Sequence, residues 1–265
     1  MRAIRTLFLL VAGCGAGSGS TPDSALPARD AAADSAAPTV DGAPLLGTNT
    51  AILGTLTGVC PSLTGMLSAP TPSLIENSVT FAGGESYARA ELSPGGQRIF
   101  DTPNAGGSST ESEVMAFEVL HFCDGATLVK TETEVLYAPP DDAGASSITD
   151  ILVGFGATKI GVSVTRVYKP TVGGMTDLEA RDLLVRKLDG INRSSQRVLA
   201  ADRWQKQILH VFVATEAAAA QVPRVLATID SATRADTIVV VTRTVGGGFV
   251  YCNPDPPLGT ECPVI

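Results

Sequence analysis

The chain of 265 residues carries 19 basic and 27 acidic side chains, which gives a formal net charge of −8. With 44% hydrophobic and 17% charged residues, its composition is that of an ordinary globular protein long enough to bury one sizeable core. The acidic balance argues against a protein whose main task is to grip a polyanion, so we do not expect a nucleic-acid partner.

The first residues have the pattern of an export signal. Arg2 and Arg5 form a basic start, residues 7–10 (LFLL) form a short apolar core, and small residues precede Cys14. This order is typical of secretory leaders. The segment VAGC, ending at Cys14, resembles a bacterial lipobox. The resemblance implies that residues 1–13 are removed and that Cys14 carries the lipid.

The alternatives for this N-terminus are a plain secretory signal without lipid and an apolar segment that arose by chance. No other run approaches the roughly 20 apolar residues that a membrane-spanning helix needs, so we expect membrane contact only through the lipid. The sequence therefore predicts an exported, membrane-anchored lipoprotein of the bacterial cell envelope.

Two segments separate the leader from the main domain. Residues 14–43 contain no aromatic residue and almost no large aliphatic one, so they predict a disordered linker behind the lipidated cysteine. Residues 44–103 alternate short apolar runs with Pro, Gly, Asn and Ser, which predicts a turn-rich extension of short strands and loops. Residues 104–265 are the predicted α/β domain.

Four cysteines besides Cys14 fit an exported protein with disulfides. Three pairings are possible, and we favour Cys60–Cys123 together with Cys252–Cys262. A zinc site is the alternative, but the spacing of the cysteines and the two histidines does not match common zinc motifs.

The main domain reads as alternating helices and strands. A helix that is apolar nearly all round precedes a strand and a hairpin, and a capping box at Thr176 and Glu179 starts a long amphipathic helix. Two continuous apolar strands follow, with a helix between them that Pro223 would kink in its first half. The predicted elements are a helix over 110–122, a strand over 127–138, a hairpin over 151–164, a helix over 176–197, a strand over 208–215, a helix over 216–229, a strand over 236–244 and a short edge strand over 249–252.

The fold class is therefore α/β, with a central mixed sheet in the order α-β-β-β-α-β followed by α-β. This order resembles that of restriction-endonuclease-like domains, the PD-(D/E)xK family, and the resemblance covers roughly residues 104–251. It implies an aspartate at a hairpin strand and a Glu-x-Lys on the next strand, which bind magnesium and activate water. The second half also looks like a set of uncharacterised bacterial and fungal proteins.

Several residues match positions of that family's site. Asp150, preceded by Thr149 instead of proline, matches the aspartate and would be the metal ligand. Glu113 or Glu118 matches an acid that often comes from the first helix. A salt-bridged or capping role is the alternative for both glutamates.

The Glu-x-Lys motif is degenerate. Alternation along the strand puts Ser163 and Thr165 on one face, so the motif reads Ser-x-Thr. Arg166 lies one residue out of phase for the place of the lysine. Serine is a poor metal ligand beside a carboxylate, and threonine cannot stabilise a developing phosphorane charge as lysine does.

The sequence therefore predicts a non-catalytic binding or structural module, without a cofactor and with an unknown envelope partner. The alternative is a metal-dependent nuclease or phosphodiesterase with Mg²⁺ or Mn²⁺ held by Asp150. Its candidate site residues would be Glu113, Glu118, Ser163, Thr165 and Arg166.

Overall fold

The computed structural model describes residues 50–51, 53–60, 63–105, 110–139 and 147–251. The predicted leader, the lipidated Cys14, the linker and the proposed Cys252–Cys262 disulfide lie outside the described residues. Within the described part, no helix combines the length and the apolar character needed to cross a membrane.

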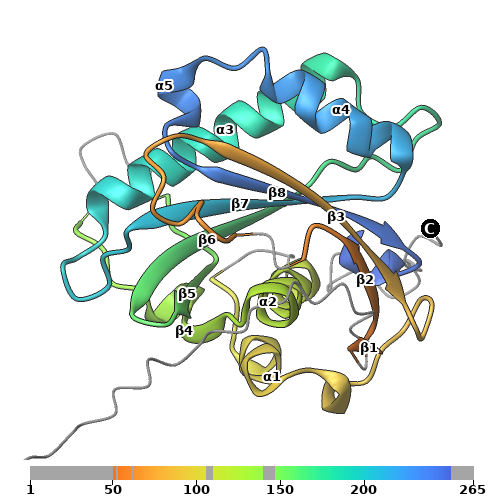
Figure 1. Ribbon diagram of the computed structural model, residues 1–265, viewed down its shortest axis with the longest axis horizontal. Helices are drawn as coiled ribbons and strands as arrows, with labels where there is room; N and C mark the ends of the chain where they lie inside the picture. The colour runs from red at the N-terminus through yellow and green to blue at the C-terminus, as the bar shows by residue number, and fades with distance from the viewer. Residues whose placement is uncertain (1–49, 52, 61–62, 106–109, 140–146, 252–265) are drawn as a thin grey trace, which may run out of the picture. The chain divides into compact units, whose positions relative to one another are not determined.

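The described residues form one eight-stranded mixed sheet between helices (Figure 1). The strand order is β1-β2-β3-β8-β7-β6-β5-β4, and the four central strands β3, β8, β7 and β6 are mutually parallel. Antiparallel pairs continue the sheet at both ends. The strands are β1 Thr50–Ala51, β2 Gly54–Gly58, β3 Ser73–Phe81, β4 Thr127–Thr131, β5 Ile151–Phe155, β6 Thr158–Arg166, β7 Lys206–Val213 and β8 Ile238–Val245.

Helices cover both faces of the sheet. Figure 1 shows α1 (Pro94–Asp101) and α2 (Thr110–Asp124) on one face, and α3 (Asp177–Arg197), α4 (Glu216–Leu226) and α5 (Ser231–Arg234) on the other. The α/β class and the chain order α2, β4, β5, β6, α3, β7, α4, β8 agree with the sequence prediction.

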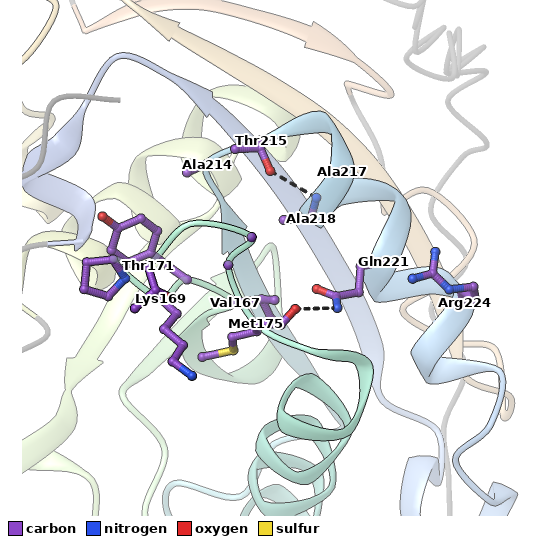
Figure 2. A pocket seen from close by; sticks show the side chains of 14 residues that line it. Val167, Lys169, Thr171, Met175, Ala214, Thr215, Ala217, Ala218, Gln221 and Arg224 are labelled. Atoms are coloured by element: carbon purple, nitrogen blue, oxygen red, sulfur yellow. Dashed lines mark hydrogen bonds between the residues drawn. The ribbon is translucent and has the colours of Figure 1, made fainter.

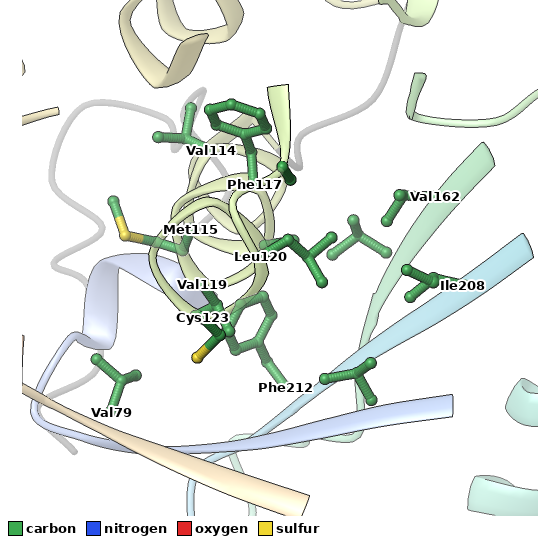
Figure 3. Close-up of a cluster of buried hydrophobic side chains, with 14 of the residues drawn as sticks. Val79, Val114, Met115, Phe117, Val119, Leu120, Cys123, Val162, Ile208 and Phe212 are labelled. Atoms are coloured by element: carbon green, nitrogen blue, oxygen red, sulfur yellow. The ribbon is translucent and has the colours of Figure 1, made fainter. Parts of the chain in front are cut away.

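The core on the α2 face is built around the nearly all-apolar helix. Met115, Phe117 and Leu120 of α2 are almost fully buried. Leu120 points toward the central strands, whereas Phe117 points away from them (Figure 3), toward Gly95 of α1. Val162 of β6 and Phe212 of β7 lie in the same cluster. Because α2 is apolar nearly all round, it is enclosed by the sheet on one side and by α1 and other segments around it.

The opposite face buries the amphipathic stripe of α3. Leu184, Leu188 and Ile191 pack with Leu209 and Val211, the residues of β7 that alternate with those facing α2. The predicted capping box is present, since Thr176 Oγ1 accepts a hydrogen bond from the N–H of Glu179. The prediction of this helix and its start is confirmed.

The turn-rich segment before residue 104 supplies three strands to the sheet. β3 lies between β2 and β8, and its residues from Ser73 to Thr80 pair in parallel with residues 238–245 of β8. Short strands were expected there, but their place in the central sheet was not predicted, because parallel pairing with a strand 165 residues later leaves no local signal.

The predicted strand over 127–138 is too long. β4 ends at Thr131 and residues 132–134 form a 3-10 turn, η2. The turn is held by Glu134, whose Oε2 accepts a hydrogen bond of 2.9 Å from the N–H of Thr131 and contacts Arg98. A strand through residue 138 would have placed Lys130, Glu132 and Glu134 on one face, and this face does not exist because the strand ends at Thr131.

Two smaller predictions near the C-terminal part are wrong. The expected edge strand after residue 248 is the 3-10 helix η3 (Gly248–Tyr251), because Gly246 and Gly247 adopt positive φ values of 72° and 75° and start a tight turn. Pro223 lies inside α4 but in the second half of that helix.

One predicted disulfide is present. Cys60, which follows β2, is bonded to Cys123 near the end of α2, with 4.8 Å between the two Cα atoms. Beside this bond, the N–H of Leu63 donates to Oδ1 of Asp124 at 2.8 Å. The prediction of the Cys60–Cys123 pairing is confirmed.

Candidate functional site

Asp150 lies at the mouth of the β5–β6 hairpin, as expected. The pairing of β5 with β6 ends at Ile151 and Val162, so β5 provides no ladder partner for Val164. The N–H of Val164 instead donates to Oδ2 of Asp150. The carboxylate thus continues the hydrogen bonding of the sheet where the neighbouring strand has ended.

Lys187 of α3 completes this cap. Its Nζ donates to the carbonyl oxygen of Val164 at 2.8 Å, so the two side chains satisfy both backbone groups of Val164. Burial raises the pKa of Asp150, and the charge of Lys187 and the hydrogen bond from Val164 oppose that shift. The arrangement is that of a half-buried acid and base holding a strand end.

Two of the predicted acids, Glu113 and Asp150, line the same small cavity, together with Glu132. The cavity has a volume of about 10 Å³, which is about the space that one water molecule needs. Asn104 donates to Oε1 of Glu113 at 2.9 Å, and the N–H of Ala105 donates to Oε2 of Glu132 at 2.8 Å.

Glu132 and Lys187 were missed by the sequence analysis. Burial raises the pKa of Glu132, the charge of Asp150 raises it further, and the charge of Lys187 lowers it. Glu132 could have been recognised as a site residue only if the sequence had indicated that the strand ends at Thr131. Lys187 carries no motif that distinguishes it from the other basic residues of α3, and its length lets it reach β6 from that helix.

Glu118 belongs to a different part of α2. Its Oε1 accepts hydrogen bonds from the N–H and the hydroxyl of Ser93, at 3.0 and 2.7 Å, at the start of α1. Its Oε2 is buried and has no partner among the described residues. Burial raises the pKa of this carboxyl, and the hydrogen bonds from Ser93 lower it. The structure does not bring Glu118 to Asp150.

The strand β6 separates the remaining candidates between its two faces. Ser163 and Thr165 pair in register with Leu209 and Val211, which face α3. Arg166 lies on the face of α2 with Val164 and donates to the carbonyl oxygen of Val250 at 3.5 Å. Burial lowers the pKa of Arg166, and the charge of Glu113 raises it. Arg166, rather than Ser163 or Thr165, therefore lies on the side of the helix acid.

A divalent metal does not fit these residues as they are arranged. Among the described residues, no three His, Cys, Asp or Glu side chains are grouped closely enough to hold a metal ion. The Asp150 carboxylate already accepts from Val164 and faces the charge of Lys187. A metal would have to displace that base or the strand end.

A larger cavity, of about 670 Å³, lies away from Asp150. It is found at the carboxyl ends of β6 and β7, beside the first turn of α4, and none of the predicted site residues lines it. Sequence patterns did not indicate this cavity, because its walls come from short loops and small residues that carry no motif.

Comparison with known proteins gives little about activity. No family model matches the chain, and no solved structure matches it. A curated relative, the "AAC-rich mRNA clone AAC4 protein" of Dictyostelium discoideum, is 41% identical over 170 residues, which are 60% of this chain and 24% of that protein. The chain thus spans about a quarter of the length of this relative, whose name describes a messenger RNA clone and no activity.

Proposed function

We propose that the chain is a non-catalytic binding or structural module of the bacterial cell envelope, with a restriction-endonuclease-like core and a lipid anchor at Cys14. One observation carries the non-catalytic part: the side chain of Asp150 is used to hold the end of β6. Its Oδ2 accepts from Val164 while Lys187 binds the carbonyl group of the same residue. The partner would be another component of the envelope.

The restriction-endonuclease-like core is supported by the order and placement of elements. α2, β4, β5, β6, α3 and β7 follow one another in the order that the family resemblance requires. Asp150 lies at the hairpin formed by the second and third of these strands. Position 163 is serine instead of glutamate and position 165 is threonine instead of lysine, which supports a core that has lost its catalytic motif.

The test is a metal-dependent cleavage assay. The chain without residues 1–13 and with Cys14→Ser would be incubated with Mg²⁺ or Mn²⁺ and with single- and double-stranded DNA and RNA. The Asp150→Asn variant would be compared with Asp202→Asn, which changes a second structural carboxylate, held by Lys130 and the N–H of Leu136. We expect no cleavage, no metal-induced rise in Tm, and a lower Tm for both variants.

Cleavage that disappears in Asp150→Asn and persists in Asp202→Asn would establish the alternative, a metal-dependent nuclease. One observation favours that alternative: Glu113, Glu132 and Asp150 line a single cavity. These three carboxylates would then hold the metal after a rearrangement that releases Asp150 from Val164.

The lipid anchor has its own test. In a bacterial host, the full chain should fractionate with membranes and Cys14→Ser should be released from them, because a lipid at Cys14 would be the only attachment. A chain that is soluble with Cys14 intact would rule out the lipobox, and one that remains bound in the variant would point to a different anchor.

A further inference from the structure

The larger cavity lies where ligands often bind in open α/β sheets, outside the carboxyl ends of parallel strands. One side is the segment after β6, from Val167 to Met175, and the other is the start of α4 (Figure 2). Its volume of about 670 Å³ is within the range of sites for small organic ligands.

Much of the wall is apolar and is supported by the core. Val167 belongs to the buried cluster on the α3 face, and Met175 and Ala218 pack against that cluster. Pro170 and Ala214 add further apolar surface. Because side chains packed on a core keep their positions, this wall can receive an apolar ligand group with little reorganisation.

Gln221 gives the cavity a specific hydrogen-bond acceptor. Its Nε2 donates to the carbonyl oxygen of Met175 and to Oδ1 of Asp177, both at 2.9 Å. Both partners are acceptors, so the orientation of the amide is fixed and its Oε1 is left toward the cavity (Figure 2). The residue is only 8% exposed, and no donor among the described residues reaches Oε1.

The charged residues that line the cavity are both basic, although the chain as a whole is acidic. They are Lys169 and Arg224, and their partners Glu179 and Asp177 do not line it. The first turn of α4 adds the positive end of a helix dipole, next to its N-cap residue Thr215. The cavity as a whole therefore favours an anionic group.

We propose that this cavity binds an amphipathic organic anion of the acylated amino acid type. The acyl chain would pack on Val167, Met175 and Ala218, an N–H group would donate to Oε1 of Gln221, and the carboxylate would lie near Arg224, one helical turn further along α4. This inference deepens the proposed function, on which it rests, by giving the binding module a ligand class.

Calorimetric titration of the chain that lacks residues 1–13 and carries Cys14→Ser tests the proposal. The probe is N-octanoylglycine. N-octanoyl-N-methylglycine carries a methyl group in place of the N–H hydrogen, and N-octanoylglycinamide carries a neutral amide in place of the carboxylate. Loss of the hydrogen bond to Oε1 of Gln221, or of the charge, should weaken binding by about tenfold. Equal affinity of the three probes would overturn the proposal, as would the absence of binding by N-octanoylglycine.

Variants locate the binding. Ala218→Leu fills the cavity from a helix position that tolerates leucine, so it should abolish binding. Arg224→Gln should weaken binding of N-octanoylglycine by about threefold to tenfold. Arg243→Gln is the control and should leave the affinity unchanged, because Arg243 of β8 pairs with Glu216 of α4 but does not line the cavity. Unchanged affinity in Arg224→Gln and in a folded Ala218→Leu would place the ligand elsewhere. Cleavage that depends on Asp150 would refute the non-catalytic role alone and leave this titration to decide the ligand.

Discussion

At the scale of single residues, the buried carboxylates differ in how completely they are satisfied. Asp202 accepts from Lys130 and from the N–H of Leu136, both at 2.8 Å, and its pKa is lowered although burial opposes this. Glu118 has one oxygen satisfied by Ser93 and the other buried without a partner among the described residues, and its pKa is raised by burial. Asp202 therefore stabilises the fold as an anion, whereas Glu118 is better tolerated as the neutral acid.

This contrast predicts a pH effect for Glu118→Gln. A pKa above its usual 4.5 in the folded protein means that the unfolded chain releases this proton first as the pH rises. The contribution of Glu118 to stability is therefore greatest below pH 4.5 and falls as the pH passes through the folded pKa. Because glutamine does not titrate, the Tm of the variant relative to the parent should rise between pH 4 and pH 8, measured by thermal unfolding at fixed ionic strength.

The matched control is Asp202→Asn, for which the sign is opposite. Its lowered pKa gives stability that is present above the usual pKa and is lost in acid, so its Tm deficit should grow from pH 3 toward neutral pH. A Tm difference for Glu118→Gln that stays constant with pH would show that the carboxylate of Glu118 is as well satisfied in the fold as in water.

At the scale of the elements, the sequence predicted what local patterns specify. The capping box at Thr176 and the apolar stripe that includes Leu184 and Leu188 predicted α3, since both signals lie within the helix itself. The continuous apolar runs of β7 and β8 predicted two buried strands for the same reason, and the structure pairs them in parallel. The position of β3 between β2 and β8 was not predictable, because its pairing partner is far away in the chain.

The candidate site was predictable only in part. Asp150 and Glu113 line one cavity because the order of the elements brings the hairpin mouth to the start of α2. The sequence predicted Glu132 to lie within a strand over 127–138, but β4 ends one residue before Glu132. The role of Lys187 depends on the reach of a long side chain from α3 to Val164, which no spacing rule gives.

The Cys60–Cys123 disulfide is the covalent link between the N-terminal strands and α2. It encloses a sequence separation of 63 residues, so it restricts the unfolded chain strongly. Replacing Cys60 and Cys123 with serine should reduce the free energy of unfolding by about 2–5 kcal/mol. The measurement is chemical denaturation in oxidising buffer, with Cys252→Ser/Cys262→Ser as the paired control. A loss below about 1 kcal/mol would mean that packing alone keeps α2 against β2 and β3.

At the scale of the whole sheet, the parallel centre is made from distant parts of the chain. β3 supplies an entire ladder to β8, and its inward residues Ile75 and Val79 join the core on the α2 face. Lys206 fixes the entry to this strand, since its buried Nζ donates to the carbonyl oxygens of Ala69 and Thr71. The extension assigned from its sequence to residues 44–103 and the domain assigned to 104–265 thus share one sheet and one core.

This shared core predicts that a chain starting at residue 104 will not fold cooperatively. It would lack Leu56, Ile75, Val79, Phe81 and Ile99, all buried in the core on the α2 face. Burial of one such side chain contributes about 1.5–3 kcal/mol, so the loss of all five is comparable to a typical total stability of about 5–15 kcal/mol. β8 would also expose the edge that β3 covers, which favours aggregation.

A chain starting at residue 42 keeps these contacts and should show a single sigmoidal unfolding transition by circular dichroism, whereas the shorter chain should show none. If the chain from residue 104 instead unfolded cooperatively with a similar Tm, the core would be complete without β3, and residues 44–103 would be an accessory layer on an independent domain.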